Sequence, residues 1–184
     1  METIILLFGV SNVGKTTTGR ILADKLGVQF IDLDEEIKKK HKVTMEGFVN
    51  MFPFAYSRAK EAGDLLTQIV NRQVSSAVVA VRPIYYARFF NTLLTRENIV
   101  AIDLQDSAEH VFERLVFTDE NDEVIDDPFY KYERQKSCMS QLRRDIQDFK
   151  RAHKKIELKY NIDNKKPDDV AADLAALLER FLRP

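Results

Sequence analysis

Residues Gly9 to Thr16 (GVSNVGKT) match the phosphate-binding pattern G-x-x-x-x-G-K-[ST] at every position. The glycines at both ends of this loop let the backbone turn tightly, so that successive N–H groups can converge on phosphate oxygens. Lys15 would reach the β- and γ-phosphates, and the Thr16 hydroxyl would bind Mg²⁺. The loop therefore predicts a nucleoside triphosphate site, with these binding residues: Gly9, Asn12, Val13, Gly14, Lys15, Thr16 and Thr17.

The segments on either side of this loop have the patterns that such a site requires. Ile4 to Phe8 form a continuous apolar run, typical of a strand buried in a parallel sheet. After the loop, Lys15 to Leu26 carries apolar residues at a spacing that suits one face of a helix. The positive end of that helix would add to the attraction for phosphate.

A second group of acidic residues follows the next predicted strand, 28–32. Asp32 and Asp34 lie where that strand ends, and ligands of open α/β sheets bind at the carboxyl ends of strands. A carboxylate there can hold Mg²⁺ through water or accept a hydrogen bond from a substrate hydroxyl. Helix capping by Asp34 is the alternative. Asp103, at the end of a later strand, could bind magnesium or serve only as a turn residue.

The bulk composition narrows the class of protein. The chain has 184 residues, 45% of them hydrophobic, and a net charge of −1. This length suits one domain, residues 1–184, and the charge argues against a nucleic-acid partner. No apolar run approaches the length of a membrane span, and the single Cys138 is compatible with a reducing compartment. We therefore expect a cytoplasmic protein, and we expect it to be a monomer.

Further along the chain, short apolar strands alternate with helices. Strands are expected at 75–81, 99–104 and 158–163, and helices at about 55–73, 84–94, 108–116 and 131–155. This alternation predicts an α/β protein with a parallel sheet flanked by helices. A polar, acidic segment at about 117–130 separates two of the helices. In phosphoryl-transfer enzymes such inserts close over the nucleotide, so we expect a small lid there.

The opening of the chain resembles the shikimate kinase family. The residues that carry the resemblance are Gly14-Lys15-Thr16-Thr17-Thr18-Gly19-Arg20, Leu22-Ala23, Leu26-Gly27, Phe30, Asp32 and Asp34. The likeness is specific over about the first sixty residues and weaker beyond. It implies a three-layer P-loop kinase fold with a five-stranded parallel sheet, a substrate-binding helical segment at about 34–72 and a lid at about 117–130.

The resemblance also implies roles for particular residues. Asp32 would help Thr16 to hold Mg²⁺, and Asp34 would receive the hydroxyl of the acceptor. Arg58, with Glu61, stands where the family has an arginine that grips the substrate carboxylate. A second carboxylate-binding arginine of the family corresponds to Arg151, and a basic residue that lies against the adenine corresponds to Lys165. Solvated surface positions are the alternatives for both arginines.

Two departures from the family pattern bear on activity. The family carries a run of glycines after its third strand, whereas this chain has Val79-Ala80-Val81-Arg82-Pro83. The lid of the family carries an arginine that stabilises charge on the transferring phosphoryl group, and residues 117–123 contain none. Losing such a cation would slow transfer strongly unless another replaces it. Arg82, Lys131 and Arg134 are the candidates.

These observations lead to one preferred hypothesis and two alternatives. The preferred one is ATP- and Mg²⁺-dependent phosphorylation of a small anionic metabolite, shikimate by resemblance, with Lys15 and Asp34 as catalytic residues. Arg58 and Arg151 would anchor the acceptor. One alternative is another small-molecule or nucleotide kinase of the same fold. The other is a nucleotide-binding relative that has lost efficient transfer and acts as a sensor or partner-binding module.

Overall fold

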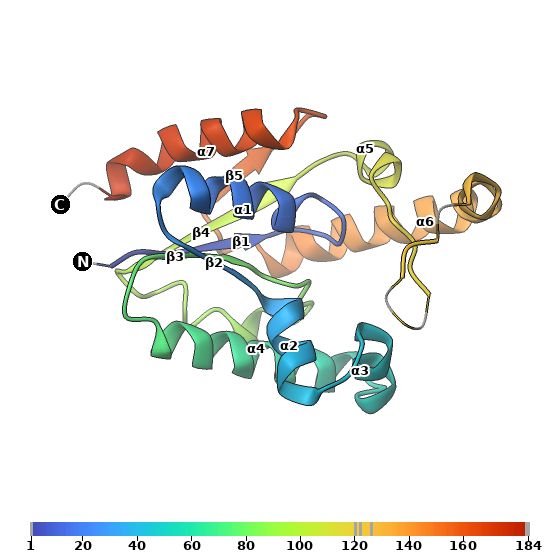
Figure 1. Ribbon diagram of the computed structural model, residues 1–184, viewed down its shortest axis with the longest axis horizontal. Coiled ribbons are helices and arrows are strands. Elements are labelled where there is room, and N and C mark those ends of the chain that lie inside the picture. Colours follow the sequence, from blue (N-terminus) through green and yellow to red (C-terminus); the bar gives the residue numbers. More distant parts are fainter. Residues whose placement is uncertain (1, 120, 122, 126, 183–184) are drawn as a thin grey trace.

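The structure is a computed structural model that describes residues 2–119, 121, 123–125 and 127–182 (Figure 1). Strands and helices alternate along most of the chain. In order they are β1 (Ile4–Phe8), α1 (Lys15–Leu26), β2 (Gln29–Asp32), α2 (Leu33–His41), α3 (Met45–Met51), α4 (Ala55–Arg72), β3 (Ala77–Ala80), the 3₁₀ turn η1 (Ala87–Phe89), β4 (Ile99–Gln105), α5 (Ala108–Glu113), α6 (Pro128–Ala152), β5 (Leu158–Asn161) and α7 (Pro167–Leu182).

The five strands form one parallel sheet in the order β2-β3-β1-β4-β5. The central strand β1 pairs with both β3 and β4, with Leu7 opposite Ala80 and Phe8 opposite Asp103. The inner strands β1 and β3 are wholly apolar and buried, as strands covered on both faces must be, whereas the edge strands β2 and β5 also carry polar residues. Because all strands run in the same direction, their carboxyl ends meet at one edge, where the glycine loop begins.

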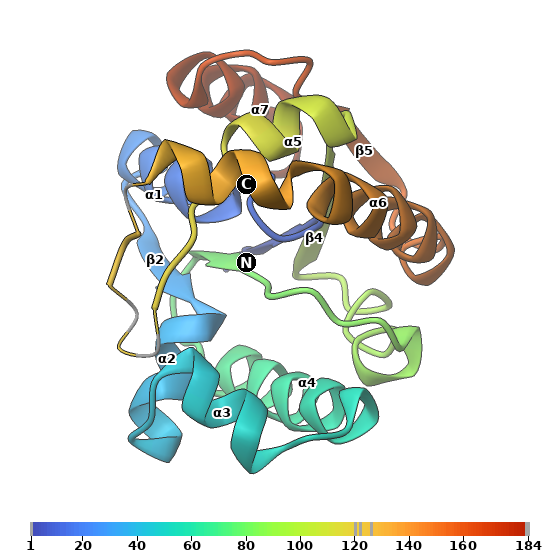
Figure 2. The ribbon, with the colours of Figure 1, turned by 90° about the vertical axis from the view of Figure 1, so that its right-hand side faces the viewer.

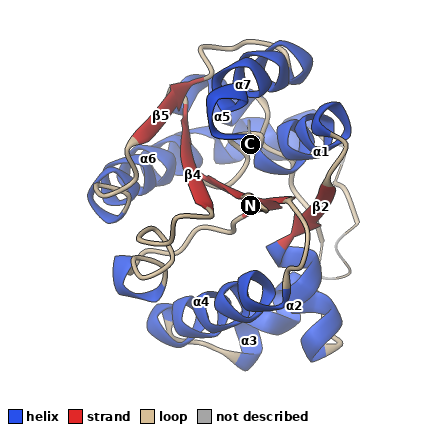
Figure 3. Ribbon diagram, turned by 90° about the vertical axis from the view of Figure 1, so that its left-hand side faces the viewer, coloured by secondary structure: helices blue, strands red, loops and turns tan. Residues whose placement is uncertain are grey.

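Helices cover both faces of the sheet, which gives the three layers that the sequence predicted. Figure 3 shows α1, α5 and α7 on one side and α2, α3 and α4 on the other. Alternation along β1 supplies both cores: Ile5 and Leu7 pack toward α1 and α7, whereas Ile4, Leu6 and Phe8 face the helices of the other layer. The expected α/β fold with a five-stranded sheet is confirmed.

The prediction of a helix at 84–94 is wrong. Only the short 3₁₀ turn η1 forms there, because tertiary contacts on two sides hold the segment in an irregular path. Tyr85 donates a hydrogen bond to Asp145 of α6 at 3.0 Å, and its ring lies 4.6 Å from the ring of Phe149. On the other side Phe89 packs so closely on Gly63 of α4 that a Cβ at Gly63 would lie 2.5 Å from the Phe89 Cβ.

The limits of two helices differ from expectation, and the helix expected at 131–155 ends at Ala152. The helix expected at 131–155 begins three residues earlier, because Asp127 accepts a hydrogen bond from the Phe129 N–H and Pro128 fits the first turn. The helix expected at 108–116 ends already at Glu113. Among the described residues no helix is both long and apolar enough to cross a membrane.

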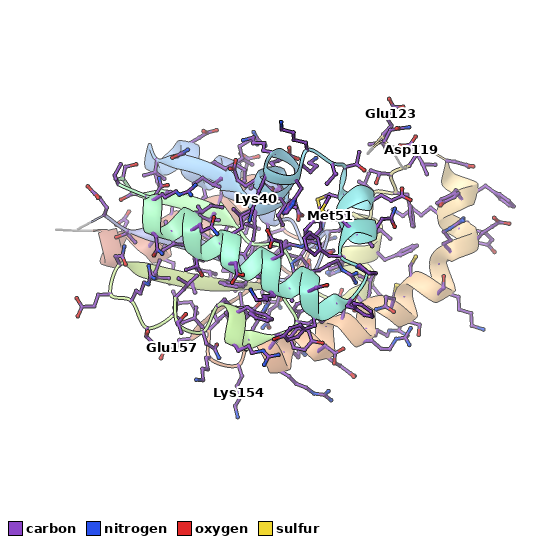
Figure 4. All side chains as sticks on the ribbon, turned by 90° about the horizontal axis from the view of Figure 1, so that it is seen from below. Lys40, Met51, Asp119, Glu123, Lys154 and Glu157 are labelled. Atoms are coloured by element: carbon purple, nitrogen blue, oxygen red, sulfur yellow. The ribbon has the colours of Figure 1, made fainter. Side chains whose placement is uncertain are left out.

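The acidic segment between α5 and α6 forms a hairpin. Thr118 pairs with Val124, and the Ile125 N–H donates to the Phe117 carbonyl at 2.9 Å. Figures 1 and 2 both show this hairpin extending from α5 and α6 toward α3. Asp119 and Glu123 project from its tip (Figure 4). The segment predicted as a lid also contains Glu120, Asp122 and Asp126, which lie outside the described residues.

Candidate functional site

The loop between β1 and α1 has a backbone that only glycine adopts without strain at two positions. Gly9 has φ +142° and Gly14 has φ +111°. A Cβ at Gly9 would lie 2.6 Å from the Leu104 carbonyl oxygen, so the loop also needs glycine for space. Gly14 precedes α1 without a side-chain cap hydrogen bond, which leaves the first N–H groups of the helix to be satisfied by a ligand.

Lys15, at the first position of α1, is folded back against this loop. Its ammonium group donates to the carbonyls of Gly9 and Val10 at 2.9 and 2.6 Å, and the residue is only 8% exposed. Burial lowers the pKa of Lys15 to about 8, although the carboxylates of Asp34 and Asp32 oppose that shift. A bound polyanion would restore the charged form, so the loop is electrostatically suited to phosphate.

Thr16 and Asp32 meet beside the loop. The Thr16 hydroxyl donates to Asp32 Oδ2 at 2.6 Å, while Asp32 Oδ1 accepts from the Asp34 N–H at 2.9 Å. Asp32, and not Asp34, therefore caps α2. The cap fixes the carboxylate next to the hydroxyl. Hydroxyl and carboxylate oxygens are ligands that Mg²⁺ prefers, so the pair fits the expected cation.

Asp34 lies next to this pair and against a cation from another element. Arg82 Nη1 approaches Asp34 Oδ1 to 3.2 Å, and the guanidinium lies over the Phe48 ring at 5.0 Å. Burial raises the pKa of Asp34, and the charge of Arg82 works against that rise. Asp34, Lys15 and Arg82 thus form one electrostatic unit, because each influences the pKa of Lys15 or Asp34.

The two arginines expected to bind a carboxylate are directed elsewhere in this structure. Arg58 donates from Nη1 to the carbonyls of Phe52 and Pro53 at 2.7 and 2.8 Å. The side chain of Arg151 is 81% exposed and lies 3.5 Å from Asp148 of its own helix. Their role in acceptor binding stays a prediction.

Lys165 follows β5 at the same edge of the sheet. Its ammonium group lies 2.8 Å from Asp173 and 3.3 Å from the Tyr160 hydroxyl, and these contacts raise its pKa. Lys165 and Asp173 are exposed, and Tyr160 is partly buried. Contact of Lys165 with an adenine stays a prediction.

A cavity of about 280 Å³ opens beside the glycine loop. Gly9 and Val10 line one side, residues 103–106 at the end of β4 line another, and Phe149 of α6 contributes an aromatic wall. Asp103 is hydrogen-bonded to the His153 ring at 2.7 Å and to Gln105 and Lys159. Burial opposes its ionisation, but these contacts hold the pKa of Asp103 below its usual value.

The sequence did not predict two pairings in the site, the buried Asp103–His153 pair and the Asp34–Arg82 pair. Their members are far apart along the chain, and neither spacing belongs to a local motif. From the sequence, Arg82 is one of three candidate cations to replace a lid arginine. The structure brings together the predicted residues Lys15, Thr16, Asp32 and Asp34, adds Arg82 and Phe48, and leaves Arg58, Arg151 and Lys165 with other partners.

The sheet order, the glycine loop and the uncapped helix behind it define a P-loop protein with the fold of small-molecule kinases. The family model for shikimate kinase matches residues 11–179. The chain belongs to the shikimate kinase family. The expected resemblance, which rested on the first sixty residues, therefore extends over most of the chain.

Individual relatives support this membership. A shikimate kinase from Macrococcus caseolyticus is 32% identical over 111 residues, which is 60% of this chain and 64% of that protein. The match thus spans less than two thirds of that relative's length. A shikimate kinase from a Sulfurihydrogenibium species is 26% identical over 176 residues, 96% of this chain and 98% of that protein.

Solved structures agree on the fold. The structure of shikimate kinase from Acinetobacter baumannii in complex with shikimate superposes with a TM-score of 0.75 at 21% sequence identity. The superposition covers 100% of this chain and 97% of the other.

Proposed function

We propose that this protein is an ATP-dependent kinase that phosphorylates a hydroxyl of a small anionic metabolite, with shikimate as the leading acceptor. The observation that carries this proposal is the position of Asp34, whose carboxylate lies in the same electrostatic unit as Lys15 and beside the Thr16–Asp32 pair. A group that can align a hydroxyl therefore lies next to the groups that would hold the terminal phosphate. We expect the enzyme to act as a monomer in the cytoplasm.

Each residue then has a task in phosphoryl transfer. The loop N–H groups and Lys15 neutralise the triphosphate, and Lys15 follows the γ-phosphoryl group as it moves. Thr16 and Asp32 would hold Mg²⁺, which when bound neutralises charge on the phosphates. Asp34 orients the acceptor hydroxyl and can take its proton, a task favoured by its raised pKa. Arg58 and Arg151 anchor the acceptor after they leave their present partners, and Lys165 contacts the adenine.

The surrounding segments would complete the site. We propose that residues 1–184 form one kinase domain, in which the helical segment 34–72 receives the acceptor and 117–130 acts as the lid. The hairpin Thr118–Val124 extends toward α3, so its closure would cover the acceptor segment. Closure would exclude water from the transfer, which suppresses hydrolysis of ATP.

The test is a coupled assay of ADP release with ATP and Mg²⁺, run with and without shikimate. Stimulation by shikimate, together with a new phosphomonoester in the ³¹P NMR spectrum, is the expected result. ADP release stimulated by a different metabolite or nucleotide would identify the related kinase. ATP binding with no stimulation by any acceptor would instead support a sensor, an alternative motivated by the absence of arginine from residues 117–123.

A further inference from the structure

We propose that Arg82 binds the anionic group of the acceptor and thereby selects anionic acceptors. This inference rests on the proposed function, because it assigns a role within the same site. Arg82 follows β3, at the edge of the sheet where the carboxyl ends of the strands meet.

The position of Arg82 is fixed from two sides. The guanidinium lies over the Phe48 ring of α3 and next to Asp34 at the start of α2, and the side chain is only 16% exposed. A cation held against an aromatic face and a carboxylate loses little further freedom when a ligand arrives. Arg82 is thus held in place beside Asp34, the residue that we propose orients the acceptor hydroxyl.

The hydrogen bonding of this pair is incomplete. Arg82 Nη1 and Asp34 Oδ1 are 3.2 Å apart, yet among the described residues neither of these two buried atoms has a hydrogen-bond partner of acceptable geometry. Buried charged groups without hydrogen bonds are unfavourable, and a ligand that supplies the missing partners relieves that cost. The remaining 42% exposure of the Asp34 side chain leaves a route for such a ligand.

An acceptor with one hydroxyl and one carboxylate supplies both partners. The hydroxyl would donate to Asp34 while the carboxylate accepts from the guanidinium. The planar fork of arginine has donors for two acceptors at once, so Arg82 can keep Asp34 and bind a carboxylate with its other edge. The guanidinium of Arg82 would then lie between the carboxylate of Asp34 and the carboxylate of the acceptor. A neutral analogue would leave one face of the guanidinium without a partner.

Arg82 is also the better placed of the candidate cations. Arg58 already donates to two backbone carbonyls, and Arg151 is largely in solvent. The contact of Arg82 with Phe48, within the proposed acceptor segment, favours acceptor binding over a contact with the transferring phosphoryl group.

The test compares shikimate with its neutral methyl ester as acceptors for the parent, Arg82→Gln, Arg82→Lys and the exposed control Arg88→Gln. Arg82→Gln should raise the KM for shikimate roughly tenfold to hundredfold, the effect of one lost charge-assisted contact, and should leave the KM values for the ester and for ATP within threefold. Arg82→Lys should be intermediate, because it keeps the charge without the fork. Arg88→Gln should resemble the parent.

Three results would overturn the inference: an unchanged KM for shikimate, equal losses for shikimate and its ester, or a fall in kcat and in acceptor-free ATP hydrolysis at unchanged KM. The last result would place Arg82 at the phosphoryl group.

Calorimetric titration of shikimate and of the ester, with a non-hydrolysable ATP analogue present, separates this inference from the proposed function. A parent that binds shikimate through Arg82 without turnover would refute only the kinase activity, whereas binding that is equal in parent and Arg82→Gln would refute the role of Arg82. If Arg82→Gln does not fold, Arg82→Lys carries the comparison.

Discussion

The two halves of the site are built in different ways. The proposed nucleotide half is a single stretch of backbone, in which Gly9 and Gly14 take positive φ angles that favour glycine. The acceptor half consists of side chains from separate elements: Asp34 of α2, Phe48 of α3 and Arg82 after β3. A local backbone structure is encoded by neighbouring residues, whereas the acceptor half depends on how distant segments pack.

The two halves of the site also differ in their balance of charge. Lys15 is a buried cation, and among the described residues its ammonium group donates to the carbonyls of Gly9 and Val10, so the nucleotide half is prepared for an anion. In the acceptor half Asp34 and Arg82 already oppose each other. We therefore propose that the first half provides general affinity for phosphate and that the second discriminates between acceptors. This difference can be tested by separate changes to each half.

The largest effect is expected from Asp34→Asn, which removes the group that we propose orients the acceptor hydroxyl. We expect kcat to fall by roughly 10²- to 10⁴-fold, because the amide cannot take the proton. Affinity for ATP should stay within threefold of the parent, since the nucleotide half is unchanged. Steady-state ADP release and calorimetry measure the two quantities.

The matched control for that change is Asp24→Asn, an exposed residue on α1. It should leave both quantities unaltered. An Asp34→Asn protein that keeps more than a tenth of the parental kcat would contradict the role of Asp34 in the transfer.

Gly9→Ala should disrupt the nucleotide half through its backbone. The new Cβ would lie 2.6 Å from the Leu104 carbonyl oxygen at a φ of +142°, so strain and overlap together should cost roughly 3 kcal/mol of folding stability. Gly27→Ala is the control, because φ is also positive but no atom lies within 4 Å. It should cost only about 1 kcal/mol. Urea unfolding of both variants measures the difference, and equal losses would show that the close approach to Leu104 is unimportant.

Lys15→Met tests the electrostatic preparation of the loop. Burial lowers the pKa of Lys15 from its ordinary value of 10.5 to about 8, so the unfolded chain binds more protons between these pH values and stability rises with pH across that window. Without nucleotide, the variant should therefore be more stable than the parent below pH 8, by up to about 3 kcal/mol, and this advantage should fade toward pH 10.5. Unfolding curves at several pH values provide the measurement. If the difference in stability between variant and parent does not change with pH, burial does not lower the pKa of Lys15.

Arg151→Ala is expected to have the smallest effect. Because its side chain is 81% exposed, solvent weakens any contact that it makes with the acceptor, so we expect the KM for shikimate to rise only roughly twofold to fivefold. An unchanged KM would contradict the proposed role of Arg151 in acceptor binding. The same kinetic assay as for Arg82 gives this value, and the two variants together show which cation dominates the acceptor half.

The sequence predicted the local parts of this architecture well and the long-range parts poorly. Helix α1 begins and ends at the residues expected, and the position of Asp34 beside the loop followed from the order of strand, loop and helix. The segment 84–94 has helical periodicity, but its contacts with α4 and α6 prevent a helix. Such contacts join residues about 25 to 60 positions apart, and no local pattern records them.

The site shows the same limit. The family likeness implies that Thr16 and Asp32 lie together, and the Thr16 hydroxyl donates to Asp32 Oδ2 at 2.6 Å. The pairing of Arg82 with Asp34 could not be foreseen, since Arg82 was visible only as a side chain where glycine was expected. Whether a new side chain blocks a site or contributes to it depends on the surrounding packing, here on Phe48.

The most direct test asks whether the glycine loop binds a triphosphate. ATP with Mg²⁺ is titrated calorimetrically into three proteins: the parent, Lys15→Met and the exposed control Lys25→Met. The parent and Lys25→Met should bind with the same affinity, and Lys15→Met should bind at least about a hundredfold more weakly, as expected from the loss of a buried charged contact to phosphate. Equal affinity in all three proteins would contradict the account, because the phosphates would then lie somewhere other than this loop.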